Sequence, residues 1–315
     1  MDLHPYKFEP IYKERIWGGR NLERLFGRRL PHGKVGESWE LADLNVGASV
    51  VSSGPEAGRK LTELTAALGA ALLGGARPRP DGRFPLLLKF LDANEVLSLQ
   101  VHPDARTAAD IGGGAAPKTE CWYVLESRDG FIYKGLLPGI SREQFRRGVQ
   151  DNTIERLVRR VEVEAGDFHY IPAGCVHALG PGVVVAEVQT PSDTTYRVTD
   201  WGRGREIHLE PSMRCIRFEP CPDAAPGAGG KTLLATEFFA VARRSAAGAA
   251  QALPERRCAA IMVLSGSAEI RHRGGVENAV PAGPGQTILV PAGLRDAVVA
   301  PAPRCDWLEI TLQEN

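Results

Sequence analysis

The side chains most able to bind a metal ion lie between residues 100 and 177. Gln100 and His102 are two positions apart, so on an extended strand both project from the same face. Glu120 begins a second apolar stretch and His177 begins a third. Two imidazoles, one carboxylate and one amide oxygen suit zinc with one coordination position left open, while manganese, cobalt and iron(II) accept the same ligand types. These four residues are therefore predicted to form a divalent-metal site.

The most specific pattern in the chain lies in residues 166–177. Glycine lets the backbone turn with φ > 0 and proline ends a hydrogen-bonded ladder, so this stretch predicts a turn, a short strand, a second turn and a new strand. The pattern G-x5-P-x-G-x2-H resembles the second signature of the cupin barrels, and its defined positions are Gly166, Pro172, Gly174 and His177. The resemblance implies that His177 opens a strand and points between two sheets.

Each candidate ligand has a simpler explanation when it is taken alone. A Gln-x-His pair on a strand is more often a hydrogen-bonded core pair, and a carboxylate such as Glu120 more often lies at the surface. The position of His177 inside its signature favours a metal-ligand role for this residue. Its assignment in turn strengthens the case that Gln100, His102 and Glu120 are ligands. His169 alternates with aromatic neighbours, and we expect it to be structural. The remaining histidines have no donor partners at ligand spacing; they are His4, His32, His208 and His272.

Composition excludes several classes of partner. The 315 residues include 38 basic and 38 acidic side chains, with no long run of either sign, which argues against nucleic acid or an anionic membrane surface. No apolar stretch approaches the length of a membrane span, and the first residues have no apolar leader region. The six cysteines have no regular spacing, so we expect reduced thiols in a cytoplasmic protein.

The turn-forming residues predict a mainly all-β fold. There are 35 glycines and 23 prolines, as expected for many short strands joined by tight turns. Residues 285–293 repeat the frame of residues 166–174, with Asp296 where the first copy has His177. We therefore expect two cupin, or jelly-roll, barrels: a metal-binding domain over residues 1–220 with small helical insertions, and a degenerate second domain over residues 231–315. The Pro- and Gly-rich residues 220–230 would link them.

Local patterns place several of the smaller elements. Leucines at helical spacing predict a helix over residues 60–73, and Ser141 with Gln144 resembles a capping box that begins another. A third helix is expected over residues 152–160. Residues 85–92 read as a strand buried on both faces, although Lys89 interrupts it.

Seven stretches taken together resemble the type I mannose-6-phosphate isomerases in their short bacterial form. The resemblance runs in order from about residue 5 to residue 205 and more loosely to the end of the chain. The stretches are Trp17-Gly-Gly, Gly36-Glu-Ser-Trp-Glu, Pro85-Leu-Leu-Leu-Lys-Phe-Leu-Asp-Ala, Leu97-Ser-Leu-Gln-Val-His-Pro-Asp, Lys118-Thr-Glu-Cys-Trp-Tyr-Val-Leu, Ile171-Pro-Ala-Gly-Cys-Val-His-Ala-Leu and Ser192-Asp-Thr-Thr-Tyr-Arg-Val-Thr-Asp-Trp.

The resemblance implies a role for each site residue. One zinc ion would be bound by Gln100, His102, Glu120 and His177. Arg197 would be the essential arginine and Glu187 the base. Lys89 and Lys118 would line the sugar-phosphate pocket, Lys118 close to the chemistry, with Ser98 beside them. Apart from the resemblance, Trp17 and Trp39 could wall a sugar site, although core packing is the favoured role of such side chains. A departure from the family is the proline in Gln189-Thr-Pro-Ser-Asp.

The function implied is the metal-dependent interconversion of mannose 6-phosphate and fructose 6-phosphate through a cis-enediol. Glu187 and Lys89 support a functional site without the resemblance, because a charge inside an apolar strand is costly unless it is paired or used. The alternatives are another cupin metalloenzyme, such as an iron(II) dioxygenase, and a non-catalytic sugar-phosphate sensor. We expect a hexose 6-phosphate as the partner, no nucleic acid or membrane partner, and a monomer or weak homodimer.

Overall fold

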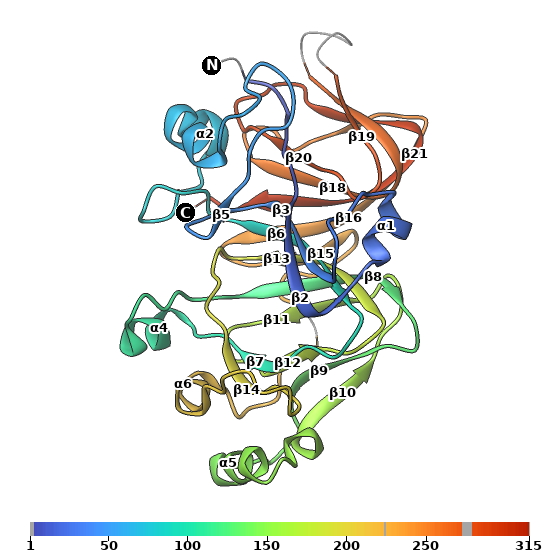
Figure 1. Cartoon of the computed structure of the whole chain (residues 1–315). Helices are drawn as coiled ribbons and strands as arrows, with labels where there is room; N and C mark the ends of the chain where they lie inside the picture. The colour runs from blue at the N-terminus through green and yellow to red at the C-terminus, as the bar shows by residue number, and fades with distance from the viewer. Residues whose placement is uncertain (1–2, 224, 273–278, 315) are drawn as a thin grey trace.

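The computed structural model describes residues 3–223, 225–272 and 279–314, and most of its regular structure is β (Figure 1). Ala224, in the predicted linker, lies outside these residues. The strands gather into two β units stacked along the long direction of the molecule (Figure 1). The prediction of a mainly all-β fold is confirmed.

The first β unit is built from two antiparallel sheets that face each other. One sheet has the order β10 (Val158–Glu162), β9 (Phe131–Leu136), β12 (His177–Leu179), β7 (Leu99–Val101), β14 (Tyr196–Thr199). The other has the order β11 (Phe168–Ile171), β8 (Glu120–Ser127), β13 (Val183–Gln189), β6 (Leu87–Ala93), β2 (Ile11–Gly19), β3 (Val35–Leu41). A buried cluster that includes Trp122, Leu179 and Val185 fills the space between them.

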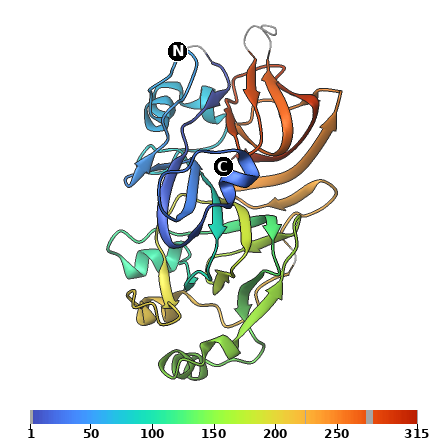
Figure 2. The same ribbon diagram turned by 45° about the vertical axis from the view of Figure 1, so that its right-hand side comes forward.

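The second β unit is one curled sheet that both ends of the chain help to form. Its order is β1 (Tyr6–Lys7), β20 (Thr287–Val290), β18 (Ala259–Arg271), β21 (Val298–Leu312), β16 (Phe239–Ala247), β15 (Thr232–Ala235), with β17 (Gln251–Ala252) on β21 and β19 (Val280–Ala282) on β18. Figure 2 shows the N-terminal segment beside the orange and red strands. The division into two cupin domains stays a prediction.

One hydrophobic core joins the two units. Along β13, Val183 and Val185 face the inside of the first unit, whereas Val184 and Ala186 belong to a cluster shared with second-unit residues such as Leu308. Successive strand residues face opposite sides, so β13 and its neighbour β6 are buried on both faces. This explains the nearly continuous apolar run predicted for residues 85–92.

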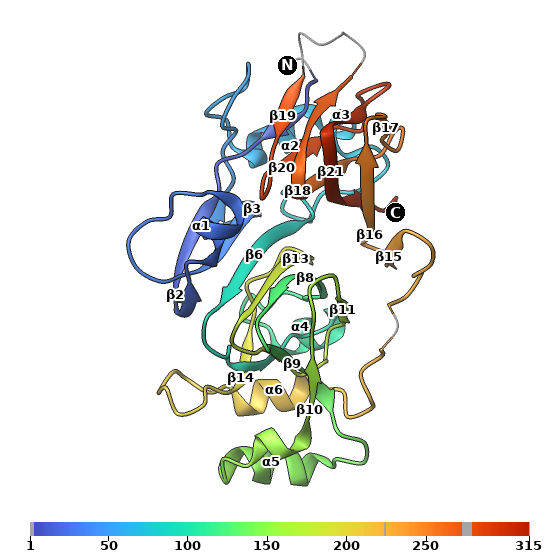
Figure 3. The same cartoon turned by 90° about the vertical axis from the view of Figure 1, so that its right-hand side faces the viewer.

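The helices lie at the periphery. They are α1 (Asn21–Phe26), α2 (Leu61–Leu68), α3 (Ala70–Leu73), α4 (Ala105–Ile111), α5 (Arg142–Gln150) and α6 (Leu209–Cys215), and β4 (Asp43–Leu44) pairs with β5 (Gly47–Ala48). Figure 3 shows α5 and α6 at the end of the molecule away from the second unit. The Ser141 capping box is confirmed. Within the described ranges no helix is both long and apolar enough to span a membrane.

Three sequence expectations differ from the structure. The helix expected over residues 60–73 is interrupted at Gly69, which separates α2 from α3. The helix expected over residues 152–160 is a single 3-10 turn, Ile154–Leu157, followed by β10, because pairing with β9 overrides local helical preference. Six reduced thiols were expected, yet Cys175 and Cys221 form a disulfide and four other cysteines are free. Cys221 packs against Gly135, where a Cβ would lie 2.7 Å from the Cys221 Cβ.

Candidate metal centre and catalytic pocket

Two rows of side chains face each other inside the first β unit. Residues directly opposite on paired strands share a face of the sheet. In one sheet this places Arg197, Gln100, His177 and Lys134 in a row across β14, β7, β12 and β9. In the facing sheet the row is Trp39, Lys89, Glu187 and Trp122, across β3, β6, β13 and β8. The register therefore delivers polar side chains to one interior region.

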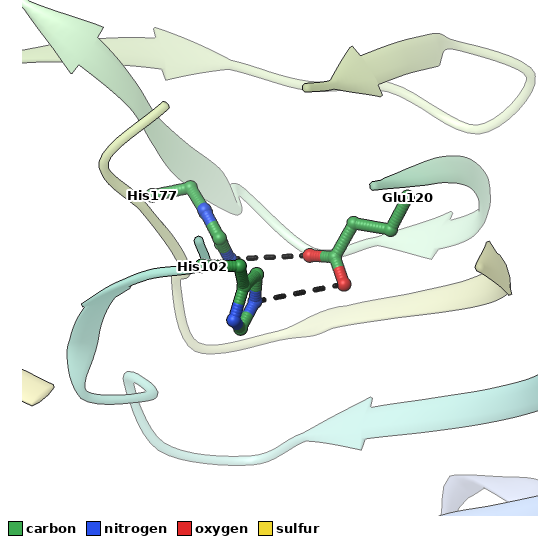
Figure 4. Close-up of side chains that lie close together, drawn as sticks. All are labelled: His102, Glu120 and His177. Atoms are coloured by element: carbon green, nitrogen blue, oxygen red, sulfur yellow. Dashed lines mark ion pairs between the residues drawn. The ribbon is translucent and has the colours of Figure 1, made fainter. Parts of the chain in front are cut away.

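Three of the four predicted metal ligands converge there (Figure 4). The donor atoms of His102, Glu120 and His177 lie within 4.8 Å of one another. The Glu120 carboxylate is 3.1 Å from His177 Nε2 and 3.7 Å from His102 Nε2. All three residues are at most 2% exposed. This is the one cluster of at least three His, Cys, Asp or Glu donors within residues 3–223, 225–272 and 279–314.

Backbone carbonyls fix the tautomer of both imidazoles. His102 Nδ1 donates to the Thr194 carbonyl oxygen at 2.9 Å, and His177 Nδ1 donates to that of Cys175 at 2.8 Å. Each ring therefore turns its Nε2 towards Glu120, and in the neutral tautomer this is the nitrogen that can bind a metal. Burial, followed by the charge on Lys118, holds the pKa of His102 well below its usual value, so this ring is neutral near pH 7.

The cluster leaves buried polar atoms that a cation would satisfy. His102 Nε2 and both carboxylate oxygens of Glu120 are inaccessible to solvent, and none makes a hydrogen bond of ordinary geometry. Lys118 Nζ, at 2.7 Å, is the nearest charge to Glu120. Gln100 lies beside the cluster, with its amide nitrogen 3.3 Å from His177 Nε2, and its role as the fourth ligand stays a prediction. This donor set fits a divalent metal ion.

A second set of charges lies on the facing sheet. Lys89 Nζ is 3.1 Å from Glu187 and 3.7 Å from Glu37, and each of these residues is at most 9% exposed. Trp122 Nε1 donates to Glu187 at 3.0 Å. Burial raises the pKa of Glu37, but Lys89 and then Arg15 outweigh it and bring the pKa to about 2. The buried carboxylates thus hold the Lys89 ammonium between them.

A pocket of about 340 Å³ opens beside these groups. The predicted residues among its lining are Trp17, Lys89, Ser98, Gln100, Lys118, Glu187 and Arg197. The His102–Glu120–His177 cluster lies behind this lining, reached through Gln100 and Lys118, which contact His177 and Glu120. The structure therefore brings every predicted site residue either into the pocket wall or into the cluster behind it.

Sequence reasoning missed five polar lining residues, namely Arg15, Glu37, Asp193, Thr195 and Arg205, and two leucines, Leu91 and Leu97. Glu37 gave no clear signal, because its strand mixes polar and apolar residues and its burial is seen only in the structure. Arg15 donates to Glu37 at 2.6 Å from an exposed stretch of β2, and nothing in its local sequence distinguishes it.

Arginines surround one side of the pocket. Arg197, Arg203 and Arg205 lie near Asp200, which accepts hydrogen bonds from the last two, and the Glu206 carboxylate also lies near Arg197. Arg197 donates instead to the Glu206 carbonyl oxygen at 2.6 Å, and its Nε is buried without a hydrogen-bond partner. Burial, followed by repulsion from Arg205, lowers the pKa of Arg197. This side of the pocket carries excess positive charge.

His169 and Lys134 lie outside the metal cluster. His169 is on β11, and burial, followed by the charge on Lys134, lowers its pKa to about 4. The expectation that His169 is not part of the donor cluster agrees with this placement. Lys134 belongs to the His177 row but does not line the pocket.

Comparison with known proteins identifies relatives over nearly the whole chain. The family model for the type I phosphomannose isomerase catalytic domain matches residues 6–125. The mannose-6-phosphate isomerase ManA of Bacillus subtilis is 35% identical over 308 residues, covering 93% of this chain and 95% of ManA. The mannose-6-phosphate isomerase of Streptococcus mutans is 34% identical, covering 83% and 87%. A crystal structure of the mannose 6-phosphate isomerase from Bacillus subtilis superimposes with a TM-score of 0.87 and 30% identity, over 98% of this chain and 99% of that one.

The donor cluster predicts how metal content depends on two nearby histidines. His177→Ala removes a buried ligand, and we expect metal affinity to fall by at least about 100-fold, the upper end of what outer-shell partners alone cause. His169→Ala is the matched control, because His169 lies in the same stretch but outside the cluster, and it should keep the metal. Elemental analysis of each variant after equilibration with zinc measures this. Equal metal content in both variants would rule out the assignment.

The Glu37 charge predicts a change in acid stability. A carboxyl with a pKa of about 2 when folded, against 4.5 unfolded, contributes about 3 kcal/mol above pH 4.5, and this contribution is lost as pH falls towards 2. Glu37→Gln should therefore lower the free energy of unfolding by about that amount at pH 7, and the difference should shrink below pH 4.5. Urea titrations across this range measure it.

The exposed Glu164 supplies the control for that measurement. Glu164→Gln should stay within about 0.5 kcal/mol of the wild type at every pH. A Glu37→Gln deficit that is independent of pH would mean that its carboxyl charge does not stabilise the fold.

Proposed function

The chain belongs to the type I mannose-6-phosphate isomerase family, and from this we propose that its pocket interconverts mannose 6-phosphate and fructose 6-phosphate with the help of a bound divalent metal ion. The resemblance read from the sequence is confirmed by the relatives. The observation that carries the proposal is the buried His102–Glu120–His177 cluster behind a pocket lined by cations. The cluster can bind a metal ion near the sugar oxygens of a cis-enediol intermediate, and the cations can bind the negatively charged phosphate.

We propose zinc as the metal, with Gln100, His102, Glu120 and His177 as its ligands. Two neutral imidazoles and a carboxylate are a common catalytic zinc set. The Gln100 amide oxygen would be the fourth donor, since a turn of the amide exchanges its oxygen with the nitrogen that faces His177. When bound, the ion supplies a Lewis acid for the carbonyl and hydroxyl oxygens of the sugar.

Glu187 is proposed as the group that carries the proton between C2 and C1. Its carboxylate lines the pocket and is 2% exposed. Lys89 and Trp122 contact the carboxylate and hold its orientation, which a proton carrier between neighbouring carbons requires. Lys118, held at Glu120, is proposed to donate to a sugar oxygen near the metal.

The arginines are proposed to carry the negative charges of the substrate. The ammonium groups of Lys89 and Lys118 already face buried carboxylates, so little of their charge is left for a phosphate dianion. The arginine group around Asp200 has one more cation than anions, counting the guanidiniums of Arg197, Arg203 and Arg205 against the carboxylates of Asp200 and Glu206. We assign the phosphate to Arg205, with Ser98 as a neutral donor, and the developing enediolate to Arg197.

Metal removal tests the reaction and the cofactor class together. The protein would be assayed for conversion of mannose 6-phosphate to fructose 6-phosphate as purified, after chelation, and after return of zinc, manganese, cobalt or iron(II). We expect activity to be lost on chelation and restored best by zinc. Activity that survives exhaustive chelation would contradict the metal mechanism. If no metal restores turnover, the protein would be better explained as a non-catalytic sugar-phosphate sensor. If the protein consumes oxygen, and does so only with iron(II), it would be better explained as a dioxygenase.

Arg197→Ala separates metal binding from turnover. Arg197 is next to Gln100 in register but contributes no donor to the metal cluster, so the variant should keep its metal content. Loss of a fixed charge beside the developing enediolate should lower kcat by about 100-fold or more. Steady-state kinetics and elemental analysis on the same preparation measure both. Unchanged kcat would remove Arg197 from the mechanism.

A further inference from the structure

A second polar cavity, of about 510 Å³, lies where the two β units meet. Its wall comes from the N-terminal segment, the end of α1, β3 and the second-unit residues 284–287. Its charged and hydroxyl-bearing lining residues are Lys7, Glu9, Tyr12, Arg28, Arg29, Glu40, Ser52, Ser53 and Thr287. No described residue lines both this cavity and the catalytic pocket. It is therefore a separate site.

One charge pair in this cavity is already complete. Arg28 makes two parallel 2.8 Å hydrogen bonds to the Glu40 carboxylate and another to Ser38 Oγ, and it also donates to the carbonyl oxygen of Gly285 in the second unit. These contacts use the Arg28 fork fully. Arg28 thus joins the two units, and the cavity's capacity for a ligand must come from its other groups.

Two buried hydroxyl groups and two cations in this cavity have no hydrogen-bond or ion-pair partner among the described residues. The hydroxyl oxygens of Ser52 and Thr287 are shielded from solvent and make no hydrogen bond, and Thr287 is only 4% exposed. Lys7 is half-buried, and neither it nor the exposed Arg29 has an ion pair or side-chain hydrogen bond among the described residues. Burial lowers the pKa of Lys7, although Glu9 partly opposes this, so a bound anion would relieve a desolvated ammonium.

We propose that this cavity is a second, non-catalytic binding site for a small phosphomonoester of a sugar or polyol, with Lys7 and Arg29 on the phosphate and the Ser52 and Thr287 hydroxyls on the polyol. Lys7 and Arg29 supply two cations against one nearby unpaired carboxylate, Glu9, so the cavity retains a net positive charge for an anion, and the buried hydroxyls match ligand hydroxyl groups. Phe8 and Phe26 supply an apolar wall of the kind that sugar rings contact. Because both units line the cavity, the ligand would bind only the assembled fold and would stabilise their junction.

Glycerol 3-phosphate is a suitable probe because it is a polyol phosphomonoester with no carbonyl to isomerise. Calorimetric titration would use protein that carries Arg197→Ala and Arg205→Ala, which removes from the catalytic pocket the side chains assigned to the enediolate and to the phosphate. We expect one equivalent of probe to bind. Adding Lys7→Gln and Arg29→Gln should weaken binding by at least about tenfold, since two charge-assisted contacts are lost. The control adds Lys231→Gln and Arg106→Gln, two exposed cations elsewhere, for the same change in net charge.

Three outcomes would overturn the proposal. They are loss of all probe binding in the protein with Arg197→Ala and Arg205→Ala alone, unchanged affinity when Lys7→Gln and Arg29→Gln are added, and equal weakening by the control pair. If that double substitution fails to fold, Thr287→Val replaces it, since it removes one buried hydroxyl at nearly constant volume and should weaken binding several-fold. In a protein with an unaltered catalytic pocket, Lys7→Gln and Arg29→Gln should leave the isomerase kcat within about twofold of the wild-type value. This result would distinguish the second site from the catalytic one.

Discussion

The structure of the site depends on a single buried carboxylate. Glu120 is fully excluded from solvent and lies among His102, His177 and Lys118. An ionised carboxylate in such a place is costly unless other groups compensate its charge. Lys118 compensates on one side, and the two imidazoles, fixed as acceptors by backbone carbonyls, leave the other side for a cation. The surrounding strands are arranged so that these four residues meet.

The second β unit contributes to the site indirectly, through the sheet that carries Lys89 and Glu187. That sheet turns one face to the pocket and the other to a hydrophobic core shared with the second unit (Figures 1 and 3). Phe90 lies beside Lys89 and is fully buried in that shared core. Without the second unit this face would be exposed to water, and the interior row would lose the rigid support that positions charged groups precisely.

The residues that could be predicted from the sequence are those with a local pattern. Gln100 and His102 follow the period of a strand, His177 ends a turn signature, and Lys89 and Glu187 interrupt apolar runs, so each is visible within about ten residues. The pairing of Cys175 with Cys221 spans 46 positions and leaves no such pattern. The prediction of a helix at residues 152–160 was wrong for a related reason. The end of this stretch forms the edge strand β10, and its pairing with β9, which comes earlier in the chain, decides its conformation.

The charge network around Lys89 shows why the rest of the site needed the fold. Arg15, Glu37, Lys89 and Glu187 come from four different strands and alternate in sign along their contacts. No two of them are near in sequence, so Arg15 and Glu37 read as isolated charges, and the apolar runs that reveal Lys89 and Glu187 do not show that the four residues are in contact. Only their burial together makes them interdependent, because removing one leaves its neighbour a desolvated and unpaired charge. The four charged residues are therefore stable only as a group in which the charges balance. A sequence pattern can reveal single members of this group but not their dependence on one another.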